Sequence, residues 1–299
     1  MKKILITGAT GFVGINLKES LNENEIETLN IRYIPNQKIE IKSDVVIHLA
    51  GKAHDLKKVS GANDYNDANF ELTKQVFDAF LQSGASTFIF MSTVKAVADK
   101  VDGTLVENIV PNPKTNYGIT KRKAEEYILN TQLSEGKRFY ILRPCMIHGP
   151  NNKGNLNLLY KVVNKGLPWP LAAFKNERSF LSITNLCFVI NEIIKNEFIE
   201  SGIYNLADDE FLSTNDLVKI IASVSNKKNF SIAIPKVVIY NIAKLGDFIN
   251  VPLNSETIQK LTEDYRVSNQ KIKTAIGIER LPFTAEQGLK HTIQSFISK

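Results

Sequence analysis

Short apolar runs alternate with amphipathic segments over the first half of the chain. Compact apolar runs bounded by polar residues predict strands, and apolar positions three and four apart predict helices. This alternation predicts an α/β fold with a doubly wound parallel sheet, in which ligands bind at the carboxyl ends of the strands. The predicted strands are Lys3–Thr7, Glu27–Arg32, Asp44–Leu49, Ser86–Met91 and Phe139–Leu142, and the predicted helices are Phe12–Asn22, Tyr65–Ser83 and Asn116–Leu133.

The pattern changes after Gly149-Pro150-Asn151. A strand over Phe180–Ile183, a helix over Leu186–Lys195 and a strand over Ile203–Leu206 are expected to return to the sheet, and Leu212–Ser298 is expected to be mostly helical and to cap a cofactor cleft. We therefore predict a dinucleotide-binding domain of residues 1–155 and 178–206. A smaller, mainly helical substrate-binding domain is predicted for residues 156–177 and 207–299.

Composition narrows the class of protein. The 299 residues are 43% apolar and 23% charged, which is typical of a globular protein with a large core. No stretch is long and apolar enough for membrane insertion, and no secretory signal is found, so a cytoplasmic location is expected. Only Cys145 and Cys187 are present, which suits a reducing compartment. The net charge of +6 comes from scattered lysines, which favours an anionic small substrate over nucleic acid.

The segment Thr7-Gly8-Ala9-Thr10-Gly11-Phe12-Val13-Gly14 directly follows the first apolar run. In a Rossmann-type fold, Gly8 permits the tight turn, Gly11 lets the backbone approach a pyrophosphate, and Gly14 lets helix and strand pack closely. Phe12 and Val13 lie at the start of the same helix. The segment predicts a nicotinamide dinucleotide site, although three glycines can also form a plain strand-to-helix turn.

Tyr117 and Lys121 are four residues apart on a predicted helix, so both project from one face. A cation beside the phenol, together with a positively charged nicotinamide ring, is expected to lower the tyrosine pKa toward working pH. Such a tyrosine can exchange a proton with a sugar oxygen during hydride transfer. Tyr240 and Lys244 have the same spacing in an apolar stretch, where we interpret them as helix packing with a solvated lysine. Spacing alone therefore leaves both interpretations open.

The strand Ser86–Met91 leads directly into Ser92 and Thr93, about two dozen residues before Tyr117. A hydroxyl at this strand end can donate to the substrate oxygen that the tyrosine serves, and Thr93 is the better candidate. An ordinary strand-end cap is the alternative. The combination with the glycine segment and Tyr117 favours the catalytic interpretation.

With these motifs together, the chain resembles the extended short-chain dehydrogenase/reductase family, whose members act on nucleotide-sugars. The resemblance runs almost end to end and rests on Gly8, Gly11 and Gly14, His48-Leu49-Ala50-Gly51, Asn69, Ser92-Thr93, Tyr117, Lys121, Leu142-Arg143-Pro144 and Gly149-Pro150. It implies that Thr93, Tyr117 and Lys121 are catalytic. It also implies that Leu49, Ala50, Gly51 and Asn69 lie along the cofactor, with Lys121 on the nicotinamide ribose, and that the chain forms a homodimer through Tyr65–Ser83 and Asn116–Leu133.

The same resemblance extends to segments that bind a UDP-sugar. Gly154-Asn155-Leu156 looks like one of them, which assigns Asn155 to the substrate. The run from Leu167 to Ala172, including Leu171, would lie along the uracil. Arg178 would reach the diphosphate, because a guanidinium can contact two phosphate oxygens at once. Trp169 could equally belong to the core.

Two departures from the family bear on the reaction. Leu29-Asn30-Ile31-Arg32-Tyr33 has no acid for the adenosine ribose and provides Arg32 instead, so NADP(H) is favoured and NAD(H) stays open. Met146 stands where epimerases of UDP-galactose typically have an asparagine, and a thioether cannot make the same hydrogen bonds. Ser92-Thr93-Val94-Lys95 most resembles reductases of UDP-4-keto-6-deoxy-N-acetylhexosamines in surface-polysaccharide synthesis, which makes Ser92 and Lys95 candidate substrate ligands.

We therefore expect an enzyme in which NADPH reduces C4 of such a ketosugar, with Tyr117 supplying the proton. A UDP-hexose 4-epimerase (of the glucose or N-acetylglucosamine type) with bound NAD is the alternative enzyme, and a non-catalytic cofactor-sensing or scaffold protein is the other class. A dehydratase is disfavoured because Val94-Lys95 replaces the Asp-Glu pair that this chemistry requires. The four histidines, His48, His54, His148 and His291, show no ligand spacing, so no metal is expected.

Overall fold

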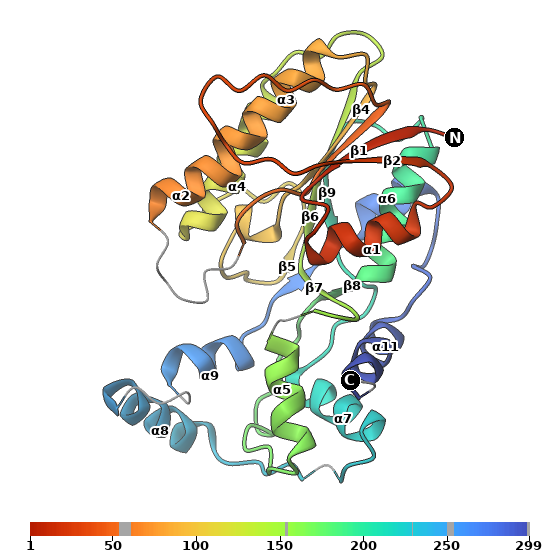
Figure 1. Cartoon of the computed structure of the whole chain (residues 1–299). Coiled ribbons are helices and arrows are strands. Elements are labelled where there is room, and N and C mark those ends of the chain that lie inside the picture. The colour runs from red at the N-terminus through yellow and green to blue at the C-terminus, as the bar shows by residue number, and fades with distance from the viewer. Residues whose placement is uncertain (54–60, 153–154, 229, 250–253, 298–299) are drawn as a thin grey trace.

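The computed structural model describes residues 1–53, 61–152, 155–228, 230–249 and 254–297. Over these residues a parallel sheet of six strands forms the upper part of the molecule in Figure 1. The strand order is β2 (Glu25–Leu29), β1 (Lys3–Thr7), β3 (Val45–His48), β4 (Thr87–Met91), β6 (Arg138–Pro144) and β9 (Gly202–Leu206). The order reverses next to β1, which is the hallmark of a doubly wound Rossmann-type sheet, as predicted.

Helices cover both faces of this sheet because its strands are apolar on both sides. Ile4 and Ile6 of β1 face α1 and α6, whereas Leu5 between them faces α3 and α4. The helices are α1 (Phe12–Ser20), α6 (Ile183–Lys195) and α10 (Gln270–Ile276) on the first face, and α3 (Leu72–Gln82) and α4 (Asn116–Leu129) on the second. A short α2 (Ala62–Asn66) and a π-helical turn (Asp67–Glu71) lead into α3.

Two sequence predictions differ from the structure. The edge strand β2 spans Glu25–Leu29 and not Glu27–Arg32. Its register is fixed by pairing with β1, and its side chains are largely exposed, so the apolar pattern is weak there. The strand predicted at Phe180–Ile183 does not return to the main sheet. It is β8 (Phe180–Ser182), which pairs in parallel with β7 (Met146–His148), while β9 alone returns to the main sheet.

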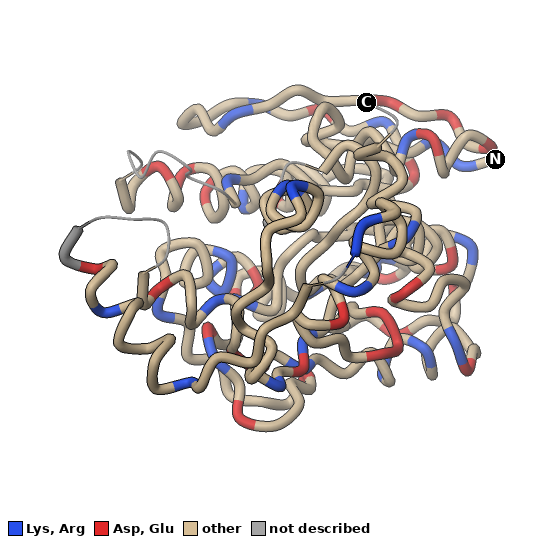
Figure 2. The backbone as a smooth tube through the Cα atoms, turned by 90° about the horizontal axis from the view of Figure 1, so that it is seen from below, with Lys and Arg blue, Asp and Glu red and all other residues tan. Residues whose placement is uncertain are grey.

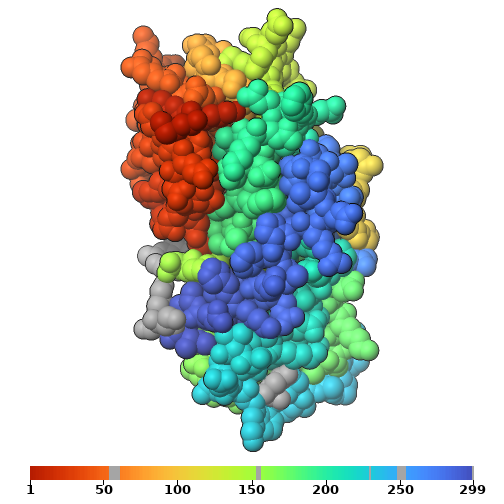
Figure 3. All heavy atoms as spheres, turned by 90° about the vertical axis from the view of Figure 1, so that its right-hand side faces the viewer, coloured from red at the N-terminus to blue at the C-terminus, as the bar shows by residue number. Residues whose placement is uncertain are grey.

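A second apolar core lies below the sheet and is built mainly by helices from the latter half of the chain. These helices are α5 (Asn155–Asn164), α7 (Thr214–Val224), α8 (Lys236–Ile249), α9 (Ser255–Thr262) and α11 (Ala285–Ile297). Figure 3 shows the C-terminal residues in blue running between this part and the sheet. The separate core is consistent with a second domain, and the exact division of the chain stays a prediction. No helix among the described residues is long and apolar enough to cross a membrane.

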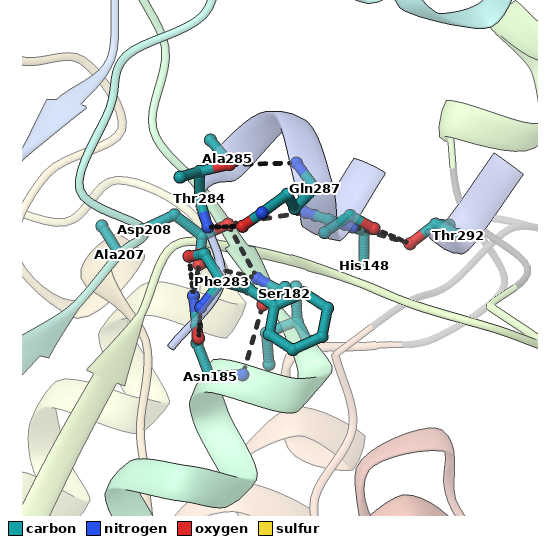
Figure 4. Close-up of polar contacts among 12 residues, drawn as sticks. His148, Ser182, Asn185, Ala207, Asp208, Phe283, Thr284, Ala285, Gln287 and Thr292 are labelled. Carbon is teal, nitrogen blue, oxygen red and sulfur yellow. Dashed lines mark hydrogen bonds and ion pairs between the residues drawn. The ribbon is translucent and has the colours of Figure 1, made fainter. Parts of the chain in front are cut away.

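A buried polar network joins the two parts where β8 meets α6 and α11 (Figure 4). The Asp208 carboxylate accepts hydrogen bonds from the Ser182 amide and from the Asn185 side chain at 2.7 Å. Asn185 in turn exchanges two hydrogen bonds with the backbone of Phe283. A second short pairing joins distant parts of the chain. Strand β5 (Thr104–Leu105), in the segment between β4 and α4, pairs in parallel with β10 (Arg266–Val267), which follows α9.

Candidate active site

The glycine segment forms the turn between β1 and α1. Gly8 has a positive φ of 68°, and a Cβ atom there would lie 2.7 Å from the Ala50 amide nitrogen at the end of β3. A Cβ atom on Gly14 would lie 2.6 Å from the Cα atom of Ala9. Gly11 caps α1 with extended backbone and without a side-chain hydrogen bond. The first amides of α1 are therefore free of side-chain caps, and the turn has no room for larger residues.

Gly51 lies beside the side chains of Asn69 and Lys121, which the family resemblance assigns to the cofactor. A Cβ atom on Gly51 would lie 2.8 Å from Asn69 Oδ1 and 3.1 Å from Lys121 Nζ. Asn69 is fully buried. Its Oδ1 accepts a hydrogen bond from the Lys52 amide, and its Nδ2 donates to the Lys52 carbonyl and to the Thr120 hydroxyl. The structure thus brings Gly51, Asn69 and Lys121 together from three separate elements.

His48 lies at the end of β3 and contacts one threonine of β1 and one of α3. Its Nδ1 lies 2.7 Å from the Thr7 hydroxyl and its Nε2 lies 3.0 Å from the Thr73 hydroxyl. Because the Thr73 hydroxyl donates to the Asn69 carbonyl, it accepts from Nε2, and Nδ1 accepts from Thr7. Burial lowers the pKa of His48 to about 3, helped by the Lys121 charge, so the ring is neutral. These contacts give His48 a structural role at the end of β3.

These residues fit a dinucleotide. Cβ atoms on Gly8 and Gly14 would collide with backbone, and a Cβ atom on Gly51 would collide with Asn69. The start of helix α1 presents amides without side-chain caps, as an anion site requires. Phe12, Val13 and Leu49 are half-buried and pack against the core beside the turn. Arg32 lies exposed just beyond β2, where the sequence has no acid.

Thr93 and Tyr117 are neighbours because α4 begins against the turn that follows β4. Thr93 is the N-cap of the 3₁₀ turn Val94–Ala96 and accepts a hydrogen bond from the Lys95 amide. Gly118 lets α4 touch this turn, since a Cβ atom on it would collide with the Lys95 carbonyl. A hydrogen bond joins the Thr93 and Tyr117 side chains.

The expected lowering of the Tyr117 pKa is not found in the protein itself. Burial raises the pKa of Tyr117 to about 12, the hydrogen bond with Thr93 opposes this rise, and the neighbouring Tyr65 adds to it. The Nζ of Lys121 donates to the Met91 carbonyl at 2.8 Å. Tyr117 therefore keeps its proton at neutral pH, which is the form that can donate one.

Lys121 is almost completely buried beside Gly51 and Asn69, with its Nζ 4.7 Å from the centre of the Phe90 ring. Burial lowers the pKa of Lys121 to about 8, and the Glu125 carboxylate one helical turn away opposes this shift. The ammonium is thus held close to its titration point at neutral pH.

Ser92 does not line the site, contrary to the expectation that it binds substrate. Its hydroxyl donates to Glu125 at 2.5 Å, and the side chain is 2% exposed. Arg143 donates to both oxygens of the same carboxylate at 2.8 and 2.6 Å. Sequence reasoning missed Glu125, although its position four residues after Lys121 on one helix was a usable signal. Arg143 was quoted as part of a motif without a role.

The two predicted substrate cations come together from different parts of the chain. Lys95 lies 4.4 Å from the centre of the Tyr265 ring and donates to the Asp99 carbonyl. Burial lowers the pKa of Lys95, and the charge of Arg178 lowers it further. The guanidinium of Arg178 donates to the Lys260 carbonyl in α9. Tyr265 and Lys260 gave no signal in the sequence, because tertiary contacts bring them here. The backbone of Tyr265 pairs with the residues around Arg178, and Lys260 lies in α9.

The remaining site predictions concern Leu171, Trp169, Asn155 and a metal site. The Leu171 side chain is 2% exposed and belongs to the second core, so only its backbone could contact a ligand. Trp169 is also core, with its indole donating to Asn215. The side chain of Asn155 and the whole of His54 lie outside the described residues. No cluster of metal-ligand side chains is found among the described residues.

The chain matches the model of the NAD dependent epimerase/dehydratase family over residues 35–207 and belongs to this family. This agrees with the resemblance to extended short-chain dehydrogenases and reductases, and it confirms the prediction of an enzyme with a nicotinamide cofactor. The preference between the two nicotinamide cofactors is not fixed by the family.

Three curated relatives show how the family divides. The UDP-glucose 4-epimerase of Vibrio cholerae is 28% identical, over 99% of this chain and 96% of its own length. The N-acetyl-alpha-D-glucosaminyl-diphospho-ditrans,octacis-undecaprenol 4-epimerase of Escherichia coli O157:H7 is 27% identical, over 97% of this chain and 94% of its own. The UDP-2-acetamido-2,6-beta-L-arabino-hexul-4-ose reductase of Pseudomonas aeruginosa is 29% identical, over 52% of this chain and 38% of its own.

Solved structures confirm the fold over the whole chain. RMD from Pseudomonas aeruginosa, complexed with NADPH, aligns with a TM-score of 0.74 at 18% identity over 100% of both chains. The UDP-glucuronic acid 4-epimerase of Bacillus cereus, in complex with NAD, aligns with a TM-score of 0.75 at 19% identity over 99% of both chains. At such identities the likeness establishes the Rossmann-type architecture and not the substrate.

Proposed function

We propose that this protein reduces the C4 ketone of a UDP-4-keto-6-deoxy-N-acetylhexosamine, with NADPH as the cofactor, in surface-polysaccharide synthesis. Bound NADPH supplies the hydride. The residues proposed to hold the cofactor are Gly8, Gly11, Phe12, Val13, Gly14, Arg32, Leu49, Ala50, Gly51, Asn69, Tyr117 and Lys121. Among them, Arg32 is proposed to contact a ribose 2′-phosphate, because β2 ends without an acid that would bind the free hydroxyl.

The protein groups act on the carbonyl oxygen. Thr93 donates a hydrogen bond to this oxygen and so polarises the ketone, and Tyr117 donates the proton that makes the new hydroxyl. The hydrogen bond between Thr93 and Tyr117 supports this pairing. Lys121 stabilises the phenolate that remains after proton transfer, because the ammonium is buried on the same helical face.

The observation that carries the choice of a reductase is Met146, which is half-buried against the second core and offers no amide to the sugar. Epimerases of UDP-galactose typically have an asparagine at this place, whose amide can hydrogen-bond the substrate. Burial raises the pKa of Tyr117 to about 12 in the protein itself, so this tyrosine is protonated at neutral pH and can donate the proton that the reduction needs.

Lys95 and Arg178 are proposed to bind the substrate, with Arg178 on the diphosphate. Their convergence beside Tyr265 supports this role, because two cations in one place can contact the oxygens of a diphosphate. The relative from Escherichia coli acts, by its name, on a sugar carried by diphospho-undecaprenol. A substrate panel should therefore include lipid-linked as well as UDP-linked sugars.

A UDP-hexose 4-epimerase with permanently bound NAD is the alternative, favoured by the full-length match to the enzyme of Vibrio cholerae. The test is to denature the purified protein, identify the released cofactor, and assay UDP-sugars and UDP-4-ketosugars with each nicotinamide. We expect little bound cofactor and ketosugar-dependent oxidation of NADPH. Stoichiometric bound NAD, with glucose and galactose forms interconverting without added cofactor, would contradict the proposal.

A non-catalytic cofactor sensor needs no proton donor, so the contact between Thr93 and Tyr117 argues against that class. The proposed homodimer through α3 and α4 is a separate proposal, supported by the family resemblance. Sedimentation velocity of the purified protein tests it, and a monomer at assay concentration would contradict it.

A further inference from the structure

Helix α8 carries an exposed apolar stripe beside the one that it buries. Ile239, Ala243 and Gly246 are buried, and Ile239 and Ala243 belong to the second core. On the exposed side, Val238, Ile242 and Leu245 are 45%, 42% and 66% exposed. At 3.6 residues per turn this stripe lies about 100° around the helix from the buried one. The exposed stripe of α8 lacks a partner among the described residues.

The neighbouring segment extends this apolar surface. Phe230 and Ile232 lie just before α8, and both are at least half exposed. They run beside Leu167, because the Trp169 amide donates to the Phe230 carbonyl and the Ile232 amide donates to the Trp169 carbonyl. We call the surface formed by Leu167, Phe230, Ile232, Val238, Ile242 and Leu245 the α8 face. Several exposed apolar side chains gathered in neighbouring segments are typical of an interaction site.

The charge of this region is mostly positive. Residues 155–175 and 220–249 contain seven lysines and one acidic residue, Asp247, in a chain that holds 31 acidic residues. The lysines are Lys161, Lys165, Lys175, Lys227, Lys228, Lys236 and Lys244, and all are exposed. Figure 2 views the molecule from this end, and the helix at its left, α8 by its place in Figure 1, carries few charged positions among its tan residues. Lysines thus surround an apolar stripe.

We propose that the α8 face docks the protein on an anionic lipid bilayer. Exposed apolar side chains flanked by lysines are the pattern of helices that lie in the membrane interface, where the apolar stripe enters the acyl boundary and the cations bind headgroups. A second copy of this chain fits poorly, because a twofold contact would bring the same lysines together with Asp247 as the one acid of this region to pair them. This docking needs no membrane span and is independent of the reaction proposed above.

The test is co-sedimentation of the full chain with vesicles of phosphatidylcholine containing phosphatidylglycerol, against vesicles of phosphatidylcholine alone. The protein should sediment with the anionic vesicles and be released by salt. Lys227→Ala with Lys228→Ala should weaken binding roughly 25-fold, at about fivefold for each lysine. Val238→Ser with Leu245→Ser should lower binding at every salt concentration, with its thermal unfolding unchanged because both side chains point outward.

Val110→Ser, Phe198→Ser and Lys195→Ala are the matched controls, since these residues are exposed outside the α8 face. They should bind anionic vesicles like the unaltered protein. Equal sedimentation with both vesicle types would overturn the proposal, as would equal losses in the controls. Self-association that is abolished in Val238→Ser with Leu245→Ser would also overturn the proposal, because a second copy would then occupy the α8 face. Binding to polyglutamate without binding to vesicles would overturn it as well, because the partner would then be an acidic protein.

Discussion

The Ser92 hydroxyl donates a hydrogen bond of 2.5 Å to the buried carboxylate of Glu125. This contact ties the end of β4, which carries Thr93, to α4, which carries Tyr117 and Lys121. Arg143 from β6 neutralises the carboxylate with two further hydrogen bonds. Removing one partner of such a buried pair typically costs about 3–5 kcal/mol, so Glu125 is a positioning residue beneath the catalytic group.

Tyr117→Phe should lower kcat by about 10²–10⁴-fold, because the phenol is the proposed proton donor. Cofactor affinity should fall only by the contact that the Tyr117 hydroxyl makes, since the glycine turn and Lys121 are untouched. Turnover with the ketosugar and NADPH titration by fluorescence measure the two effects. Tyr240→Phe is the control, because Tyr240 has the same spacing to a lysine but packs its ring on Phe174. Equal activity of the Tyr117 variant and the unaltered protein would exclude Tyr117 as the acid.

Activity should fall as the pH rises through about 8, because Lys121 then loses the proton that it keeps below this pKa. The pKa of Tyr117, near 12, lies outside this window. Glu125→Gln removes the negative charge that raises the pKa of Lys121, so the alkaline limb should move to lower pH. Lys121→Arg keeps its charge and should remove the limb while lowering the rate.

The pH dependence of kcat/KM, measured together with Tm, separates these effects from lost stability. A Glu125→Gln variant that loses stability but keeps the alkaline limb in place would assign Glu125 a purely structural role.

Gly8→Ala should destabilise the protein by about 1–3 kcal/mol and abolish cofactor binding. The alanine would be strained at a φ of 68°, and its Cβ would lie 2.7 Å from the Ala50 amide nitrogen. Gly136→Ala is the control, since Gly136 has a φ of 80° in open space and should show the backbone cost of about 1 kcal/mol alone. Urea unfolding and NADPH titration measure both. Retained NADPH affinity in Gly8→Ala would place the pyrophosphate elsewhere.

Arg32→Glu should reverse the cofactor preference, because the carboxylate repels a 2′-phosphate and can bind the two ribose hydroxyls. The ratio of kcat/KM for NADPH to that for NADH should fall by at least about tenfold, because roughly one charge-assisted contact to the 2′-phosphate is lost. Lys38→Glu, a change of the same charge at another exposed position, should leave the ratio unchanged. An unchanged ratio in Arg32→Glu would remove the argument for NADPH.

The sequence predicts the sheet and the glycine turn well because both depend on local patterns. The buried strands are continuous apolar runs, and Gly8 and Gly14 occupy positions where a Cβ atom would collide with backbone. The edge strand β2 is shifted by two residues because partly exposed charged positions blur its pattern. The pairing of β8 with β7 could not be predicted, since it depends on which loops meet beside the sheet.

The site was predicted less completely than the fold. Local spacing identified Tyr117 and Lys121, but not the direction of the Tyr117 pKa, which depends on burial and on the charge of the distant Tyr65. Ser92 was assigned to the substrate because its hydroxyl stands beside Thr93, whereas alternation along the strand turns it toward Glu125. Tyr265 joins Lys95 only through tertiary pairing.

The most direct test of the proposed reaction uses NADPH deuterated at the transferable position with a UDP-4-keto-6-deoxy-N-acetylhexosamine. The proposal predicts one equivalent of cofactor oxidised per sugar and deuterium at C4 of the product by NMR and mass spectrometry. Conversion of a UDP-hexose to its C4 epimer, without net oxidation of added cofactor and without deuterium in the product, would contradict it.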